Sequence, residues 1–171
     1  MKTDADKNLL RLAKAGNRYA AGKLLQKYRD RILALAYDYT GNYEEARDIA
    51  QDVFVKALDS IGGFEGKSGF STWLYRIAIN QCLNRLRSHE RKKRLMEQER
   101  LRSVDRKENP AEPFPIDLDR ADLSRAQRTT VILRYFNDLP VSEIAEILNC
   151  SEKTVRTHIY RAIRKLRSQN D

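Results

Sequence analysis

One face of a predicted helix carries residue types that hold unpaired nucleic-acid bases. The segment GFSTWLYRIAIN, residues 69 to 80, has apolar residues at helical spacing that form a single stripe. Trp73, the only tryptophan of the chain, falls outside this stripe. It shares a sector of the helix with Arg76, Asn80, Asn84 and Arg87, and we call these five residues the tryptophan strip. Aromatic rings stack on bases while amides and guanidinium groups bond base edges, so the strip is a candidate surface for single-stranded nucleic acid.

The tryptophan also has a structural interpretation. In this alternative its ring packs under the loop between Phe64 and Phe70 as part of the core, because tryptophans are mostly buried in proteins. The two interpretations are compatible if one edge of the ring stays open. Stacking one base contributes about 1–3 kcal/mol, which is enough to offset the opening of a few base pairs but not of many.

A second candidate surface lies in the run PVSEIAEILNCSEKTVRTHIYRAIRKLR, residues 140 to 167. A short helix bearing Ala145, a turn at Asn149 and a second helix capped by Ser151 have the spacing of a helix-turn-helix. Six basic residues and one acidic residue lie between 151 and 168, so an ordinary solvated basic face is the weaker alternative. The candidate DNA-contacting residues of the second helix are Lys153, Thr154, Arg156, Thr157, Tyr160 and Arg161. These types reach guanine edges, thymine methyl groups and phosphates.

A third candidate surface is acidic. Asp48, Gln51, Asp52 and Val55 recur at i, i+3, i+4 and i+7 opposite an apolar stripe, and we call them the acidic face. Carboxylates around an exposed valine indicate a docking surface for a basic partner helix. The sequence supports equally a face that only keeps the protein soluble.

These three surfaces require helices to position them, and the whole chain has helical periodicity. Asn42 with Glu45, and Ser124 with Gln127, stand in capping-box arrangement at two helix starts. We expect the first four helices over about residues 4–15, 17–40, 42–61 and 71–94. The sequence thus predicts an all-α protein with two small helical domains. A four-helix N-terminal domain (1–95) and a C-terminal helix-turn-helix domain (121–171) are joined by a flexible linker (96–120) that holds three prolines.

Composition narrows the function classes. The chain has 33 basic and 24 acidic residues, a net charge of +9 that favours a polyanionic partner. Cys82 and Cys150 form no metal-binding motif, and we expect no metal, no cofactor and no disulfide. With no signal peptide or long apolar run, we expect a soluble cytoplasmic protein without membrane insertion. The GKS at 66–68 lacks the glycine of a phosphate-binding loop, since Ile61 stands there, and we expect no enzyme.

Three collinear segments resemble the bacterial sigma factors. FEGKSGFSTWLYRIAINQCLNRLR resembles the part that recognises and melts the −10 promoter element, and YEEARDIAQDVFVKAL resembles the adjoining segment that binds the clamp helices of RNA polymerase. The segment from 123 to 167 is similar to the domain that reads the −35 element. The short two-domain layout is that of the extracytoplasmic-function group.

The resemblance implies a role for each surface. The acidic face would contact the polymerase clamp helices, and the helix-turn-helix would enter the major groove of the −35 duplex. The loop at 65–71 would take a flipped base, so Lys67, Ser68 and Ser71 join the tryptophan strip as candidate −10 contacts. Partners would be core RNA polymerase, promoter DNA in duplex and melted form, and an anti-sigma factor.

The alternative function is a stand-alone helix-turn-helix regulator that acts without docking to core polymerase. That alternative leaves the acidic face and the tryptophan strip without a role. In the sigma-factor interpretation the two promoter elements lie about one and a half helical turns apart, roughly 50 Å. A 25-residue coil spans about 25–30 Å on average, so we expect polymerase to fix the distance between the two domains.

Overall fold

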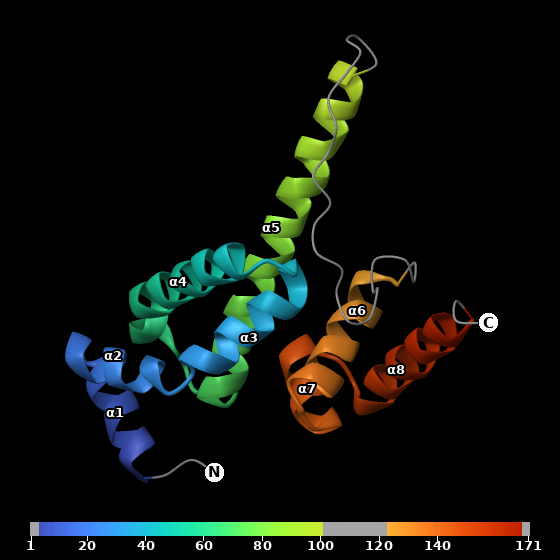
Figure 1. Ribbon diagram of the computed structural model, residues 1–171. Coiled ribbons are helices and arrows are strands. Elements are labelled where there is room, and N and C mark those ends of the chain that lie inside the picture. Colours follow the sequence, from blue (N-terminus) through green and yellow to red (C-terminus); the bar gives the residue numbers. More distant parts are fainter. Residues whose placement is uncertain (1–3, 101–122, 169–171) are drawn as a thin grey trace.

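The structure, a computed structural model, describes residues 4–100 and 123–168, and every regular element there is helical, which confirms the all-α prediction. The N-terminal bundle contains α1 (Asp4–Lys14), α2 (Arg18–Gln26), α3 (Arg29–Thr40), α4 (Tyr43–Ser60), the 3-10 turn η1 (Ile61–Gly63) and α5 (Phe70–Arg100). The C-terminal bundle contains α6 (Arg125–Val131), which continues as the π-helical turn η2 (Ile132–Phe136), then α7 (Val141–Leu148) and α8 (Glu152–Arg167) (Figure 1).

The segment predicted as one helix over 17–40 is two helices, so the N-terminal bundle has five α-helices where four were expected. The break falls at Lys27 and Tyr28, where the Tyr28 amide donates to the Leu25 carbonyl at 2.9 Å. Both residues keep right-handed helical dihedral angles, with φ −65° at Lys27 and −104° at Tyr28. The apolar period therefore passes through the bend unchanged, and periodicity alone does not reveal it.

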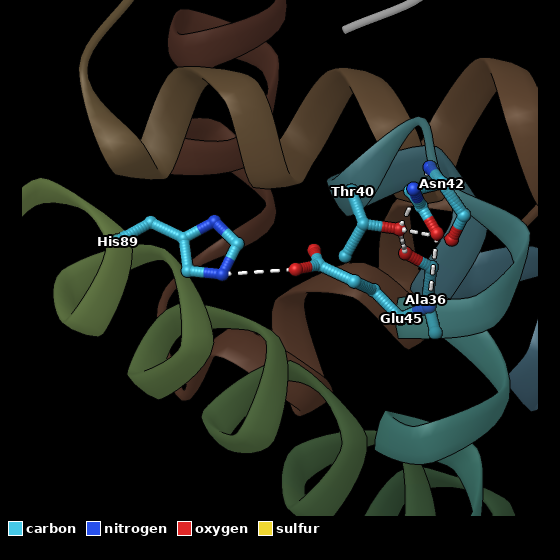
Figure 2. A network of polar contacts seen from close by, with 5 residues as sticks. All are labelled: Ala36, Thr40, Asn42, Glu45 and His89. Carbon is cyan, nitrogen blue, oxygen red and sulfur yellow. Dashed lines mark hydrogen bonds and ion pairs between the residues drawn. The ribbon is translucent and has the colours of Figure 1, made fainter. Parts of the chain in front are cut away.

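The start of α4 agrees with the prediction in part. The side chain of Asn42 accepts from the Glu45 amide at 3.1 Å, as an N-cap does. The Glu45 carboxylate does not complete a capping box; it pairs with Nε2 of His89 at 2.9 Å. Figure 2 shows this ion pair bridging the first turn of α4 to α5, beside the Thr40–Asn42 hydrogen bonds. His89, which is distant in sequence, therefore binds the Glu45 carboxylate that a capping box would have used.

Local signals in the C-terminal bundle are confirmed. Ser124 and Gln127 form both halves of a capping box at the start of α6. Asn149 ends α7 in the left-handed region with φ 51°, which an asparagine tolerates better than most side chains. Ser151 caps α8 by accepting from the Thr154 amide at 3.1 Å. The two helices and this turn form the predicted helix-turn-helix.

Helix α5 is longer than expected. It ends at Arg100 rather than near Arg94, and Figure 1 shows its second half projecting away from both bundles. The first residues of the predicted linker, 96–100, therefore belong to this helix. The rest of the linker, 101–120, lies outside the described residues.

The two bundles pack directly against each other. Helix α7 contacts α5, and η2 contacts α3 (Figure 1). Buried apolar side chains of both bundles, such as Leu35, Leu74, Ile132 and Ile144, form one continuous cluster. No sequence signal indicated this packing, and it determines which candidate residues remain exposed.

Candidate nucleic-acid and protein-binding surfaces

The acidic face of α4 is open to solvent. Asp48, Gln51, Asp52 and Val55 are all exposed, and Val55 has 51% of its surface accessible. The opposite side of the helix is buried through Ala46, Ile49, Ala50, Val53 and Ala57. Within the described residues neither Asp48 nor Asp52 forms an ion pair, so both carboxylates are available to an external cation.

The sequence analysis missed one residue of this surface. Leu58 continues the apolar spacing of α4, which ordinarily places a residue in the core, yet it is 41% exposed. It stands three residues after Val55, so the two side chains lie on neighbouring turns. An exposed aliphatic pair beside unpaired carboxylates fits a protein contact better than a merely solvated face.

The position of Trp73 is compatible with both a structural role and base stacking. Its ring packs against Phe64 and Phe70, with ring centroids 5.4 Å away in each case. Phe70 in turn meets Tyr28 and Phe64 edge-on at 5.6 and 5.9 Å. Both phenylalanines are buried, whereas Trp73 is only partly so. The ring is therefore anchored by aromatic neighbours and still reaches the surface.

The outer part of the tryptophan strip is exposed. Asn80, Asn84 and Arg87 face solvent along α5, and the Arg87 guanidinium donates to the Asn84 side chain at 3.3 Å. Beside Asn80 lies a hollow of about 390 Å³ between α4 and α5. Four polar residues that were not predicted line it, and two of them, Lys56 and Gln81, are joined by a hydrogen bond of 3.1 Å; the others are Asp59 and Ser60. Residues 44–65 hold six acidic residues and only two basic ones, Arg47 and Lys56. This isolated positive charge was the one feature of the sequence that could have drawn attention to Lys56.

The loop between η1 and α5 is buried at both ends and exposed between them. Phe64 and Phe70 are buried, whereas Lys67 is 85% exposed and pairs with Glu65. Ser68 and Ser71 are partly buried and line a hollow of about 440 Å³ beneath the loop. Tyrosine and phenylalanine rings also line this hollow, an environment that suits a planar base.

Arg76 is the exception within the tryptophan strip, because its guanidinium is engaged by the C-terminal bundle. Its Nε donates to the Ile147 carbonyl at 3.2 Å, and its Nη2 donates to the Glu146 carbonyl. These carbonyls lie in the last turn of α7, where a cation interacts favourably with the helix dipole. Buried Thr72 adds a 3.4 Å hydrogen bond from its hydroxyl to the Glu146 carboxylate.

The exposed side of α8 carries its candidates as predicted from helical spacing. Lys153, Arg156, Tyr160 and Arg161 are exposed, Tyr160 by 67%. The two threonines bond within the helix. The Thr154 hydroxyl meets the Ser151 hydroxyl at 2.9 Å, and the Thr157 hydroxyl donates to the Lys153 carbonyl at 2.9 Å. Both threonines are partly buried beside the exposed basic residues.

Residues 4–100 and 123–168 hold no group of three or more histidine, cysteine, aspartate or glutamate side chains arranged to bind a metal ion. In the same ranges no helix combines the length and apolarity needed to cross a membrane.

Family descriptions match both bundles. Sigma-70 region 2 matches residues 24–92, and Sigma-70 region 4 matches residues 121–166. Among solved structures, CnrH in complex with the cytosolic domain of CnrY is 25% identical with a TM-score of 0.68, and each chain is covered to 98%. The sigma factor RpoE from Bartonella quintana, in complex with the anti-sigma factor NepR, shares the fold at 22% identity and a TM-score of 0.64, with 86% of this chain and 94% of that chain covered.

Relatives of known class match along nearly the whole chain. The ECF RNA polymerase sigma factor SigW of Bacillus subtilis is 33% identical over 178 residues, with 95% of each protein covered. The RNA polymerase sigma-H factor of Pseudomonas aeruginosa is 32% identical over 182 residues, covering 93% of this chain and 90% of that protein. The chain therefore belongs to the extracytoplasmic-function group of the sigma-70 family and is an RNA polymerase sigma factor.

Proposed function

We propose that this sigma factor docks on the clamp helices of core RNA polymerase through the acidic face of α4 and directs the enzyme to promoters through two DNA surfaces. Residues 1–95 form the domain that binds polymerase and opens the −10 element with the tryptophan strip and the preceding loop. Residues 121–171 form the domain that reads the −35 duplex with α8, and residues 96–120 connect the two. The chemistry of RNA synthesis belongs to the core enzyme.

The observation that carries this proposal is the acidic face itself. Its two aspartates have no ion-pair partner within the described residues, and they flank the exposed pair Val55 and Leu58. A stand-alone helix-turn-helix regulator needs only α7 and α8, and it gives this surface no role. The hypothesis of a merely solubilising face does not account for two exposed aliphatic side chains.

Binding to core polymerase tests the proposal. Asp52→Arg places a cation where a basic partner helix would dock, and we expect it to reduce retention of the protein on immobilised bacterial core polymerase by at least tenfold. The matched control is Asp30→Arg, which makes the same charge change at an exposed position on α3. Far-UV circular dichroism checks that both variants keep the helicity of the parent protein. Equal retention of the Asp52 variant and the parent would refute docking through this face.

Further partners follow from the same assignment. CnrH and the Bartonella RpoE are sigma factors solved with a bound partner, the cytosolic domain of CnrY and the anti-sigma factor NepR. By analogy this chain has an anti-sigma factor that limits its access to polymerase. Its site of action is the cytoplasm, where core polymerase and promoter DNA are found.

A further inference from the structure

The first two helices carry a positive charge to which the proposed function gives no role. Residues 7–27 contain six basic residues and no acidic one, namely Lys7, Arg11, Lys14, Arg18, Lys23 and Lys27. Surfaces that only keep a protein soluble mix both signs of charge, whereas a run of one sign attracts a partner of the opposite sign. The charge of α1 and α2 therefore indicates a polyanionic partner.

Helix α1 places three of these cations along one flank. Lys7, Arg11 and Lys14 recur at i, i+4 and i+7, so they follow the helix over roughly 10 Å, and all three are exposed. Arg18, exposed at the start of α2, continues the series, and we call these four residues the basic row. Arg11 donates to the neutral side chain of Asn8 at 3.2 Å. Within the described residues no carboxylate pairs with Arg11, Lys14 or Arg18, so their charges are available to a partner.

One end of the basic row reaches the loop proposed to take a −10 base. Lys7 lines the hollow of about 440 Å³ beneath this loop, together with the loop residues Gly66 and Ser68. The tryptophan strip lies on the helix that follows the loop, and the basic row lies on a helix beside it. A strand held by the loop therefore has cations within reach on α1.

The other end of the basic row lies beside η1. Lys14 and Arg18 line a hollow of about 230 Å³ together with Gly62. A Cβ atom added to Gly62 would stand 4.0 Å from the Lys14 carbonyl oxygen, so α1 and η1 are in close contact. Asp59 also borders this hollow but lies beyond ion-pair distance of both cations. The basic row thus runs alongside the chain from the loop back to η1.

An exposed aromatic ring stands next to the basic row. Tyr19 is 73% exposed, more than any other large apolar side chain that the structure describes. The Lys23 ammonium lies 5.6 Å from the centroid of its ring, within the range of a cation–π contact. Rings among cations bind single strands, because bases stack on the ring while the cations hold the phosphates. An intact duplex offers no unstacked base, so Tyr19 favours a single strand as the partner.

We propose that the basic row and Tyr19 bind the backbone of the melted promoter strand immediately downstream of the −10 element. The inference rests on the proposed function, in which the loop holds a base of that element. Upstream, α8 reads the −35 element as intact duplex, so the strand that stays single beyond the loop is the one that continues toward the start site. Because phosphates carry no sequence information, this contact strengthens binding at every promoter alike.

The affinity that a single-stranded tail adds to a promoter probe tests the proposal. The probe is a promoter fragment from a mapped start site, duplex through the −35 element and single-stranded through the −10 element. It either ends there or continues downstream as a short thymidine tail. We expect the tail to raise the affinity of the parent holoenzyme about tenfold, and Lys14→Gln with Arg18→Gln to remove most of this gain. Each lost phosphate contact lowers the salt slope of single-strand binding by about 0.7, so the slope should fall by about 1.4 in this variant.

Two further variants separate charge from stacking. Arg164→Gln with Arg167→Gln removes the same charge at exposed positions of α8, and the gain from the tail should persist whatever happens to duplex binding. Tyr19→Ala removes a ring but no charge, so it should reduce the gain several-fold and leave the salt slope unchanged. Far-UV circular dichroism checks that all variants keep the helicity of the parent protein.

Several outcomes would overturn the proposal. The gain from the tail could be equal in the Lys14–Arg18 variant and the parent, could fall equally in the α8 control, or the variant could be weakened alike on both probes. Reduced retention of the variant on immobilised core polymerase would assign the basic row to a protein contact instead. Each of these results would exclude the basic row as the site of the downstream strand.

The same measurements distinguish this inference from the proposed function. If the parent holoenzyme binds the short probe but the tail adds nothing, the proposed function stands and the inference fails. If the protein binds neither core polymerase nor the short probe, the proposed function fails. Binding of the protein alone to oligothymidylate then decides whether the row is a single-strand surface. Its salt slope should still fall by about 1.4 in the Lys14–Arg18 variant, and an unchanged slope would overturn the assignment.

Discussion

The two proposed DNA surfaces of this protein differ in exposure. On α8, the proposed contacts Lys153, Arg156, Tyr160 and Arg161 project into solvent, and Arg156 pairs with Glu152 of the same helix. On α5, Trp73 is packed against two phenylalanines, and Arg76 is bonded to the neighbouring bundle. If the two surfaces bind DNA as proposed, the one on α8 is presented as folded, whereas Arg76 must leave α7 before it can contact melted DNA. The comparison predicts that recognition of the −35 element precedes opening of the −10 element.

The largest effect in this comparison should come from α8. Arg161→Ala removes an exposed guanidinium from the proposed groove-reading side, and loss of one good base contact corresponds to about 1–3 kcal/mol, roughly 5- to 150-fold in affinity. Holoenzyme binding to a promoter duplex is the measurement. A fragment that carries only a pre-melted −10 element should bind the variant and the parent alike. Equal losses on both fragments would mean that Arg161 does not read the −35 element.

An effect of about tenfold is expected from the tryptophan strip. Trp73→Ala removes a stacking surface worth about 1–3 kcal/mol per base, so the rate of open-complex formation should fall more than affinity for a pre-melted promoter. The ring also packs on Phe64, and the variant will lose thermal stability for that reason alone. Phe64→Leu serves as the control, because it disturbs the same packing and leaves the strip intact. Similar defects in both variants would assign Trp73 to the core only.

The smallest effect is a pH dependence of folding stability. Burial raises the pKa of Asp38 from 3.8 to about 6, and the hydrogen bond from Asn137 opposes this shift. Its titratable neighbours stay neutral over this range, since burial raises the pKa of Cys82 to about 12 and also raises the pKa of Tyr39. The guanidinium of Arg128 lies beside Tyr39 and donates to its carbonyl.

The sign follows from the raised value. A carboxyl that holds its proton more tightly in the folded protein stabilises the fold fully below about pH 4, and this contribution is lost as the pH rises through about 6. We therefore expect Asp38 to lower the midpoint temperature of unfolding between pH 5 and pH 7, with no further change above. Asp38→Asn should remove this part of the pH dependence, as thermal melts of the variant and the parent would show. An Asp38 contribution that rises with pH would contradict the assignment.

Features that depend on neighbouring residues could be predicted from the sequence. The caps at Asn42, Ser124 and Ser151 and the left-handed turn at Asn149 were all expected and are all present. Each involves side-chain and backbone groups within four residues, so the local chain determines it. The positions of the candidate residues on helix faces followed from the helical period for the same reason.

Features that depend on distant residues could not be predicted. Glu45 bonds His89 instead of its own helix start, and Arg76 bonds α7 instead of facing solvent. Leu58 continues an apolar spacing yet stays exposed, although Ala57 before it and Ile61 after it are buried, because no neighbouring element covers its side of α4 fully. In each case a tertiary neighbour, present or absent, decides the outcome, and spacing along the chain carries no information about it.

Initiation by the reconstituted enzyme tests the central claim most directly. Bacterial core polymerase, with and without the purified protein, would transcribe a library of genomic fragments, and the 5′ ends of the transcripts would be mapped. Start sites that depend on the protein and share two sequence elements at one fixed spacing are the predicted result. Transcripts that start at the same sites with and without it, or that share only a single upstream element, would contradict a sigma factor that reads DNA with both bundles.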